Sequence, residues 1–439
     1  MIDFIKPFQY ASVTVNHQSK RTMKKIIIYL LLGIIPLQVI SQSKRDDVVK
    51  TISNSAGTSM AYKFQHQEYT SPPTGYVPFY VNHVGRHGSR VHTSETLFPD
   101  LASIFKDADN DNLLTEKGKE VKQKIDEING YMYKRYGDLS SIGAEEQKGI
   151  AKRMFNNYPE IFNDEKCVID AKSTLVPRCI LSMSYFCLEM KEMNPSISID
   201  MESSDYNNYY LNFYSKEYRD YYEEGPWRDI RDSFTDKILS TDRFISSLFK
   251  SSVPARLGDK KNFMTNFWSA AIILEASGIN ISLYDVFTED EIFALWQIQN
   301  LNQYLRKGPS GINNNIAITI AKPMLKNFIE TSQAAIEKKD ISANLRFAHA
   351  EGIIPFAALL GIKEASITEP DPQKVYEVWN DYKVAPMGAN IQWIFYKNSE
   401  GEIIVKILHN EREVHIPVKT NMAPYYKWKD IVAYYIKLI

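Results

Sequence analysis

Two arginines flank a histidine in the run Arg86-His87-Gly88-Ser89-Arg90, and these residue types at this spacing suit chemistry on a phosphate. Two guanidinium groups in fixed positions can bind the non-bridging oxygens of a phosphoryl group, and a neutral imidazole beside them can attack phosphorus. Gly88 lets the backbone approach a ligand closely. The alternative interpretation of this run is a solvated basic turn.

A metal site is another possible interpretation of the same segment, because His83 and His87 stand four residues apart. Gly85 disfavours the helix that would bring both imidazoles to one side. Arg86 and Arg90 would also repel a cation. We therefore expect neither a metal nor a cofactor.

Three segments share a pattern in which a short β-rich run ends at polar residues and a helical pattern follows. The first run ends near His83, the second covers 167–174 and the third covers 344–348. Such units build a largely parallel sheet flanked by helices, and ligands bind beyond the carboxyl ends of its strands. The sequence therefore predicts an α/β fold whose strand ends face one pocket. The polar residues at these ends are Arg86, His87, Arg90, Arg178, His349 and Glu351.

Residues 195–325 show helical patterns without clear buried strands, and we interpret them as an inserted helical lobe. The α/β domain then comprises residues 42–194 and 326–439. Its C-terminal part is predicted to include a β-hairpin of 390–396 and 402–409. The helical segments expected in the lobe include 236–248, 261–276 and 290–306.

Residues 1–41 have the pattern of a secretory signal preceded by an extension. Met23 and two lysines are followed by an apolar run over 26–40 and then by small and polar residues, with cleavage expected after Ser41. The run is shorter than a bilayer span of about 20 residues, and Pro36 interrupts it. We therefore expect Met23 to be the start of a periplasmic or secreted protein with no stable membrane span.

The chain of 439 residues has a formal net charge of -1, which gives no support for a nucleic-acid partner. Its three cysteines, Cys167, Cys179 and Cys187, allow at most one disulfide. Cys179 and Cys187 are expected about 12 Å apart along one helix, too far to bond to each other. We favour buried thiols, and a bridge from Cys167 is the alternative.

With these motifs in view, the chain resembles the histidine phosphatase superfamily, in its acid phosphatase and phytase branch. The matching segments are Arg86–Arg90, Leu114–Gly118, Ser173–Arg178, Tyr304–Gly308, Phe347–Glu351 and Asn410–Glu411. The triplet His349-Ala350-Glu351 is similar to the His-Ala-Glu of multiple inositol polyphosphate phosphatases, where phytases and acid phosphatases usually carry His-Asp. His92 is a departure, because relatives often have proline there, and it puts the conformation of the pocket rim in question.

The resemblance implies that His87 becomes a phosphohistidine and that Glu351 donates a proton to the leaving oxygen. The residues that it implies for holding the phosphoryl oxygens are Arg86, Arg90, Arg178 and His349. Phosphoryl transfer needs positioning and neutralisation of spread negative charge, which such a set supplies. The guanidiniums should lower the pKa of His87 below about 6.5, whereas Glu351 must be protonated to act, so we expect an acidic to near-neutral optimum. Taken singly, His349 and Glu351 also suit the start of a helix.

These observations predict an exported phosphomonoesterase that acts on a small phosphorylated substrate, an inositol polyphosphate such as phytate. The alternatives are a broad acid phosphatase, a sugar-phosphate phosphatase, or a phosphate-binding protein without turnover. Arg306 and Lys307 are candidates for contacts to the other phosphates of the substrate. The tyrosine-rich stretch 206–222 could be a stacking surface for a ligand, but we favour packing.

Overall fold

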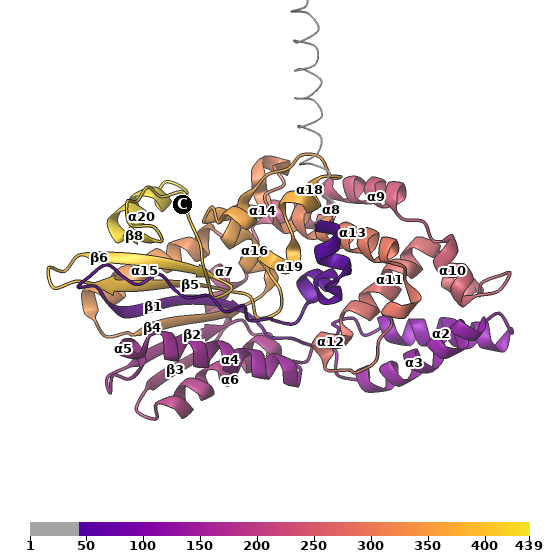
Figure 1. The fold of residues 1–439 in the computed structure, drawn as a ribbon, viewed down its shortest axis with the longest axis horizontal. Coiled ribbons are helices and arrows are strands. Elements are labelled where there is room, and N and C mark those ends of the chain that lie inside the picture. Colours follow the sequence, from indigo (N-terminus) through magenta and orange to yellow (C-terminus); the bar gives the residue numbers. More distant parts are fainter. Residues whose placement is uncertain (1–43) are drawn as a thin grey trace, which may run out of the picture. The chain divides into compact units, whose positions relative to one another are not determined.

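An eight-stranded β-sheet occupies the centre of the fold, and helices lie on both sides of it (Figure 1). The structure is a computed structural model that describes residues 44–439. Residues Val48–Ile439 form one compact unit, and all the elements named below belong to it. The predicted secretory signal and its cleavage position lie outside the described residues.

One half of the sheet is parallel, with the strand order β3-β2-β4-β1. These strands are β1 (Val77–Arg86), β2 (Val168–Ser173), β3 (Ser198–Ser203) and β4 (Ala343–Ala348). Arg86 pairs with Ala348 and Ser173 pairs with Phe347, so the three predicted runs end at the same edge of the sheet. This arrangement confirms the expected strand–loop–helix units.

The other half of the sheet is antiparallel. Its strands are β5 (Asn390–Lys397), β6 (Ile403–His409), β7 (Arg412–Glu413) and β8 (Tyr425–Lys427). β5 pairs with β1, and β6 pairs with β5, which confirms the predicted C-terminal hairpin. The sheet is therefore mixed, because this hairpin extends the parallel strands on the β1 side.

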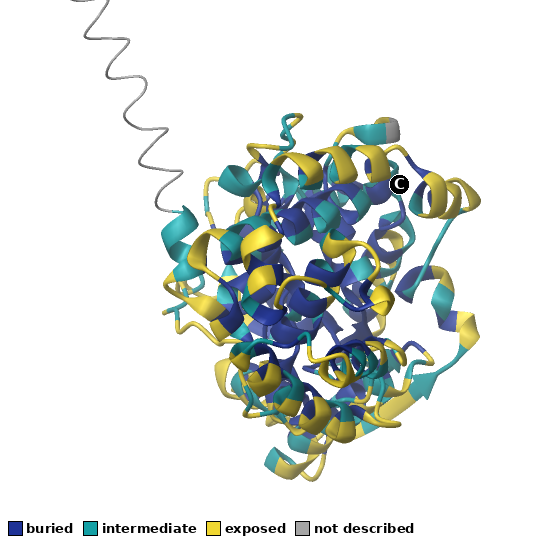
Figure 2. Ribbon diagram, turned by 90° about the vertical axis from the view of Figure 1, so that its right-hand side faces the viewer, coloured by how far each residue is buried: buried dark blue, intermediate teal, exposed yellow. Residues whose placement is uncertain are grey.

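The two faces of the sheet are covered by different helices. On one face lie α4 (Ser141–Asn157), α5 (Pro159–Phe162) and α6 (Pro177–Met193), and on the other lie α15 (Lys322–Lys338), α16 (Ala350–Leu359) and α20 (Trp428–Tyr435). Side chains of β1 point alternately to the two faces of the sheet. Val81 packs with α4 to α6, whereas Tyr80 and Val84 pack on the opposite face. The buried residues gather in the interior in Figure 2, between exposed outer helix faces.

The helical lobe draws on more of the chain than predicted. Its core includes α2 (Leu97–Asn110) and α3 (Glu116–Met132), which pack with helices from the predicted insertion. Those helices are α8 (Lys216–Glu224), α9 (Trp227–Ile238), α10 (Asp242–Leu248), α11 (Lys260–Ile272), α12 (Leu274–Ser277) and α13 (Glu289–Lys307). The predicted segment 236–248 is interrupted between α9 and α10. The segment 261–276 is likewise divided between α11 and α12.

The predicted lower limit of the lobe, residue 195, is wrong for β3, which belongs to the sheet. β3 is an edge strand and most of its side chains are exposed or half-buried, so it lacks the apolar run by which a buried strand is recognised.

Short elements complete the unit. The short helices are α7 (Asn208–Leu211), α14 (Ile316–Thr319), α17 (Lys363–Ser366), α18 (Val375–Val378) and α19 (Asp381–Val384). The 3-10 helices are η1 (Ile52–Ser59), η2 (Asp205–Asn207), η3 (Ala255–Leu257), η4 (Tyr284–Val286) and η5 (Ile312–Asn315). All three cysteines are free and buried, as predicted. Among the described residues, none of the helices has the length and apolar character needed to span a membrane.

Candidate active site

The backbone of the Arg86–Arg90 segment is held between the ends of two strands. The amide of Arg86 donates to the carbonyl of Ala389 at 2.7 Å, and the amide of His87 donates to the carbonyl of Ala348 at 3.0 Å. The second bond links the segment to the end of β4. His87 is therefore positioned by main-chain hydrogen bonds at the edge where the parallel strands end.

The His87 imidazole is oriented as a nucleophile requires. Its Nδ1 lies 2.8 Å from the carbonyl oxygen of Gly88. Because a carbonyl only accepts, Nδ1 must carry the hydrogen, and the lone pair remains on Nε2. Burial, and then the charges of Arg86 and Arg178, lower the pKa of His87 well below its ordinary value. The ring is therefore neutral and nucleophilic in mildly acidic solution.

Three arginines surround this imidazole from separate elements: Arg86 at the end of β1, Arg90 beyond it, and Arg178 in the first turn of α6. Burial lowers the pKa of Arg86 to about 10, and burial together with Arg86 and Arg178 lowers that of Arg90 to about 9. The Nε of each arginine is buried and has no hydrogen-bond partner among the described residues. Positive charge that is partly removed from water, with buried donors that have no partner, favours the binding of an anion.

His349 lies beside the candidate nucleophile. Its ring centre is 5.6 Å from that of His87, and it is the N-cap residue of α16. Its Nε2 lies 3.1 Å from the hydroxyl oxygen of Thr174, which follows β2. Burial lowers the pKa of His349 to about 4, although Glu351 opposes that shift. The structure thus brings residues from three strand ends together, as the sequence predicted.

Glu351 is in the first turn of α16 and forms an ion pair with Lys307, whose Nζ lies 2.8 Å from its Oε1. Burial raises the pKa of Glu351, but the ammonium of Lys307, with smaller contributions from His349 and a backbone hydrogen bond, holds the pKa below its ordinary range. The expectation that Glu351 is protonated therefore does not hold while Lys307 contacts it. The two candidate distal residues differ: Lys307 is buried in the site, whereas Arg306 stacks on Tyr222 at 4.0 Å.

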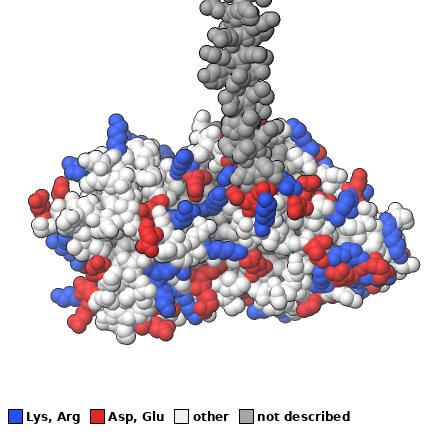
Figure 3. Space-filling model, viewed as in Figure 1, with Lys and Arg blue, Asp and Glu red and all other residues white. Residues whose placement is uncertain are grey.

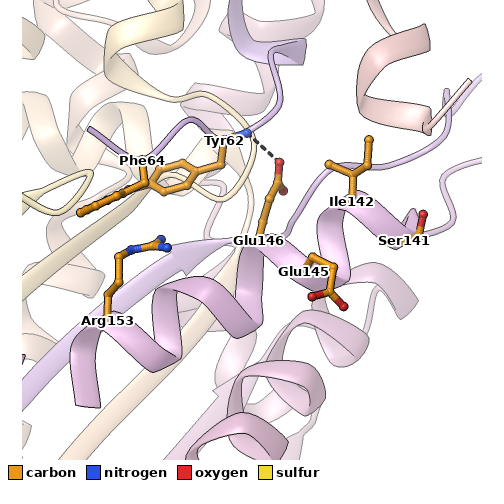
Figure 4. A pocket seen from close by; sticks show the side chains of 7 residues that line it. All are labelled: Tyr62, Phe64, Ser141, Ile142, Glu145, Glu146 and Arg153. Atoms are coloured by element: carbon orange, nitrogen blue, oxygen red, sulfur yellow. Dashed lines mark hydrogen bonds between the residues drawn. The ribbon is translucent and has the colours of Figure 1, made fainter. Parts of the chain in front are cut away.

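A buried carboxylate, that of Glu146, holds the backbone of the Arg86–Arg90 segment by hydrogen bonds. The two oxygens of Glu146 accept hydrogen bonds from the amide and hydroxyl of Ser89, each at 2.6 Å. Glu146 also accepts from the amide of Tyr62, and this bond is drawn in Figure 4, at a hollow of about 420 Å³. The amide of Gly88 donates to Ser182 on α6 at 3.0 Å. Sequence analysis missed Glu146 and Ser182, because each lies on a helix far from the motif and has no local signature.

Close packing fixes the distance between this segment and α4. A Cβ on Gly143 would lie 2.1 Å from the carbonyl oxygen of Ser89, and a Cβ on Gly88 would lie 2.3 Å from the carbonyl oxygen of Gly143. Neither glycine has room for a larger residue. The pair sets how closely the loop that carries His87 approaches the N-terminal turn of α4.

The structure also shows where the tyrosine-rich stretch and Glu411 lie. Tyr210, Tyr218 and Tyr221 are buried in the core, which agrees with packing for much of the tyrosine-rich stretch. Glu411 is buried and accepts two hydrogen bonds from Arg153, each at 2.8 Å. Among the residues from 44 onward, no group of three or more His, Cys, Asp or Glu is placed to hold a metal ion.

Comparisons with known proteins agree with this architecture. The profile of the histidine phosphatase superfamily (branch 2) matches residues 238–410, a range that contains His349 and Glu351. Over this range the chain is similar to that superfamily. The segment Arg86–Arg90 lies before the matched range. Among curated proteins, no sequence matches the chain.

Several solved structures share the fold. The Bifidobacterium longum multiple inositol polyphosphate phosphatase, in complex with inositol hexasulfate, matches with a TM-score of 0.75 and 20% identity over 86% of this chain and 96% of that chain. The phytase from D. castellii has a TM-score of 0.64 and 17% identity over 88% and 85%. The Hafnia alvei phytase has a TM-score of 0.53 and 11% identity over 84% and 98%. At these identities the likeness establishes the fold.

Proposed function

We propose that the protein is a phosphomonoesterase that hydrolyses inositol polyphosphates such as phytate through a phosphohistidine intermediate. The observation that carries the proposal is the surrounding of one neutral imidazole by three guanidinium groups, each with a buried Nε donor that has no partner among the described residues. A phosphoryl group would neutralise these charges and accept these donors.

In the first step, Nε2 of His87 attacks phosphorus and the bond between phosphorus and the ester oxygen breaks. Glu351, once protonated, gives its proton to the departing oxygen. Arg86, Arg90 and Arg178 stabilise the charge on the equatorial oxygens as the transition state forms. The product of this step is an alcohol and a phosphorylated His87.

In the second step, water attacks phosphorus and the bond between phosphorus and Nε2 of His87 breaks. The carboxylate of Glu351 removes a proton from that water, which restores the acid for the next cycle. Inorganic phosphate leaves and the imidazole is neutral again. A protein that only bound phosphate would need neither the nucleophile nor the acid.

The preference for inositol polyphosphates is supported by the His349-Ala350-Glu351 triplet and by the excess of cations in the site. The structural neighbours include a multiple inositol polyphosphate phosphatase crystallised with inositol hexasulfate. On the face drawn in Figure 3, acidic and basic side chains are interspersed.

We also propose that the protein is exported to the periplasm or secreted, on the basis of the pattern in residues 1–41.

Digestion of phytate by the purified protein tests the proposed function. Chromatography of the products over time should show inorganic phosphate and lower inositol phosphates, and His87→Ala should release neither. Rates on phytate, glycerol 2-phosphate and p-nitrophenyl phosphate then separate an inositol polyphosphate phosphatase from a broad acid phosphatase. Absence of phosphate release from all three substrates would overturn the proposal.

A further inference from the structure

The ion pair between Lys307 and Glu351 joins the helical lobe to the α/β domain inside the site. Lys307 is the last residue of α13, and its side chain is 6% exposed, whereas that of Glu351 is 28% exposed. Gly308 is the C-cap residue of α13: its backbone is extended and its amide donates to the carbonyl of Tyr304, so the helix ends at Lys307. The lysine is therefore placed against Glu351 by the end of a long helix.

This contact conflicts with the role of a proton donor. A carboxyl group beside an ammonium is ionised, because the ion pair favours the charged form of both partners. Burial lowers the pKa of Lys307, and Glu351 opposes that shift. While this ion pair is formed, Glu351 is a carboxylate, so the ammonium must leave it before Glu351 can donate a proton in the first step.

The groups that act on Glu351 come from every element around it. They are Arg86, Arg90, Cys179, Tyr214, Tyr218, Tyr222, Lys307 and His349. The thiol and the phenols are neutral in mildly acidic solution because burial raises the pKa of each. Lys307 is the cation in this set for which the structure shows direct contact with the carboxylate.

We propose that Lys307 is a positioning residue that holds Glu351 as a carboxylate before substrate binds and moves to a second phosphate of the bound substrate. This inference rests on the proposed function. When the ammonium leaves, Glu351 takes a proton from solvent, and that proton passes to the ester oxygen as the bond from phosphorus breaks. The donor is therefore activated best by a substrate with a phosphate next to the one being cleaved.

Charge in this region favours a second anion. Arg306 precedes Lys307, and its Nε is buried without a partner among the described residues. Arg86 acts on Lys307, so the ammonium lies near the cations that bind the first phosphate. Five cations, Arg86, Arg90, Arg178, Arg306 and Lys307, meet two carboxylates here, Glu146 and Glu351. One phosphate dianion therefore leaves positive charge unneutralised.

Proton uptake on binding tests the inference without catalysis. Inositol hexasulfate and inorganic sulfate remain fully ionised near pH 5, so calorimetry in buffers of different ionisation enthalpy reports protons taken up by the protein. We expect the wild type to take up more protons with inositol hexasulfate than with sulfate, by up to about one per site. Glu351→Gln and Lys307→Met should both abolish the difference, the first because the acceptor is gone and the second because Glu351 is already protonated.

The pH profile of kcat/KM provides a second readout. Glycerol 2-phosphate has a poor leaving group that needs the acid, whereas p-nitrophenyl phosphate needs it little. Lys307→Met should move the basic limb for glycerol 2-phosphate upward by about one to three pH units and leave that for p-nitrophenyl phosphate in place. It should also raise KM for phytate. Lys307→Arg should restore the wild-type profile, and Lys216→Met, at an exposed ion pair on α8, should change nothing.

The outcomes separate this inference from the proposed function. If inositol hexasulfate does not bind and no ester is hydrolysed, the proposed function fails. If the ligand binds and the wild type is active, but proton uptake is equal for both anions, the role of Lys307 is refuted. If Lys307→Met lowered kcat/KM equally for phytate, glycerol 2-phosphate and p-nitrophenyl phosphate, and shifted no limb of the pH profile, the role of Lys307 would be structural and the inference would be refuted.

Discussion

The contact between Gly143 and Ser89 leads to the most specific prediction, because substitution of this glycine changes no charged or polar group in the site. Replacement of Gly143 by alanine puts a methyl group 2.1 Å from the Ser89 carbonyl oxygen and 2.6 Å from its amide nitrogen. Both atoms are backbone, so no side chain can rotate away. The segment that carries His87 must move relative to α4.

The size of this movement follows from the contact distances. Ordinary van der Waals contact for a Cβ begins at about 3.4 Å, so the two segments must separate by about 1 Å. A displacement of about 1 Å in a catalytic group lowers the rate by about 100-fold. Alanine also favours a helix over glycine by about 0.5–1 kcal/mol, so α4 itself should not be weakened.

The measurement is kcat/KM for glycerol 2-phosphate, together with thermal unfolding. Gly143→Ala should lose about 100-fold in kcat/KM and remain folded. Gly130→Ala on α3 is the matched control, because its Cβ would meet nothing within 4 Å, and it should keep full activity. Wild-type kcat/KM in Gly143→Ala would refute the claim that this packing positions His87.

Three further predictions concern protons. Glu351→Gln should lower kcat on glycerol 2-phosphate by about 100-fold or more, but should slow the phosphorylation step with p-nitrophenyl phosphate much less, as measured by its burst phase. Arg178→Gln removes a charge that lowers the pKa of His87, so the acidic limb of the rate profile should move to higher pH; an unmoved limb would contradict that electrostatic role. Burial lowers the pKa of His83 in the folded protein to about 3. Below about pH 6.5, His83 therefore gains a proton in the unfolded chain but not in the folded one. The free energy of unfolding consequently falls as the pH falls from 6.5. His83→Phe should reduce the slope of unfolding free energy against pH by up to about 1.4 kcal/mol per pH unit, measured by urea denaturation between pH 6.5 and 4.

The strand ends and the residues that they position were predictable from sequence. Arg86, His87, His349 and Glu351 lie within a few residues of their strand ends, so local periodicity was enough to place them at one edge of a sheet. The helix that presents Arg178 was also predictable, because Pro177 suits the first position of a helix.

The residues that hold these side chains in place come from helices that are distant in the sequence. No local sequence pattern predicts their contacts. Glu146 contacts a residue 57 positions earlier, and it is an ordinary helical glutamate in sequence. The protonation state of Glu351 depends on Lys307, which reaches it from another helix. Strand β3 escaped prediction for a different reason, since an exposed edge strand needs no apolar run.

Covalent trapping at His87 tests the central claim most directly. The protein is mixed with a ³²P-labelled substrate, quenched in alkali within milliseconds, digested and mapped by mass spectrometry, with Glu351→Gln used to slow the hydrolysis of the intermediate. The account predicts an acid-labile, alkali-stable phosphate on the peptide that contains His87, and none in His87→Ala. Turnover at the full rate without such a label, or a label on another residue, would contradict the account.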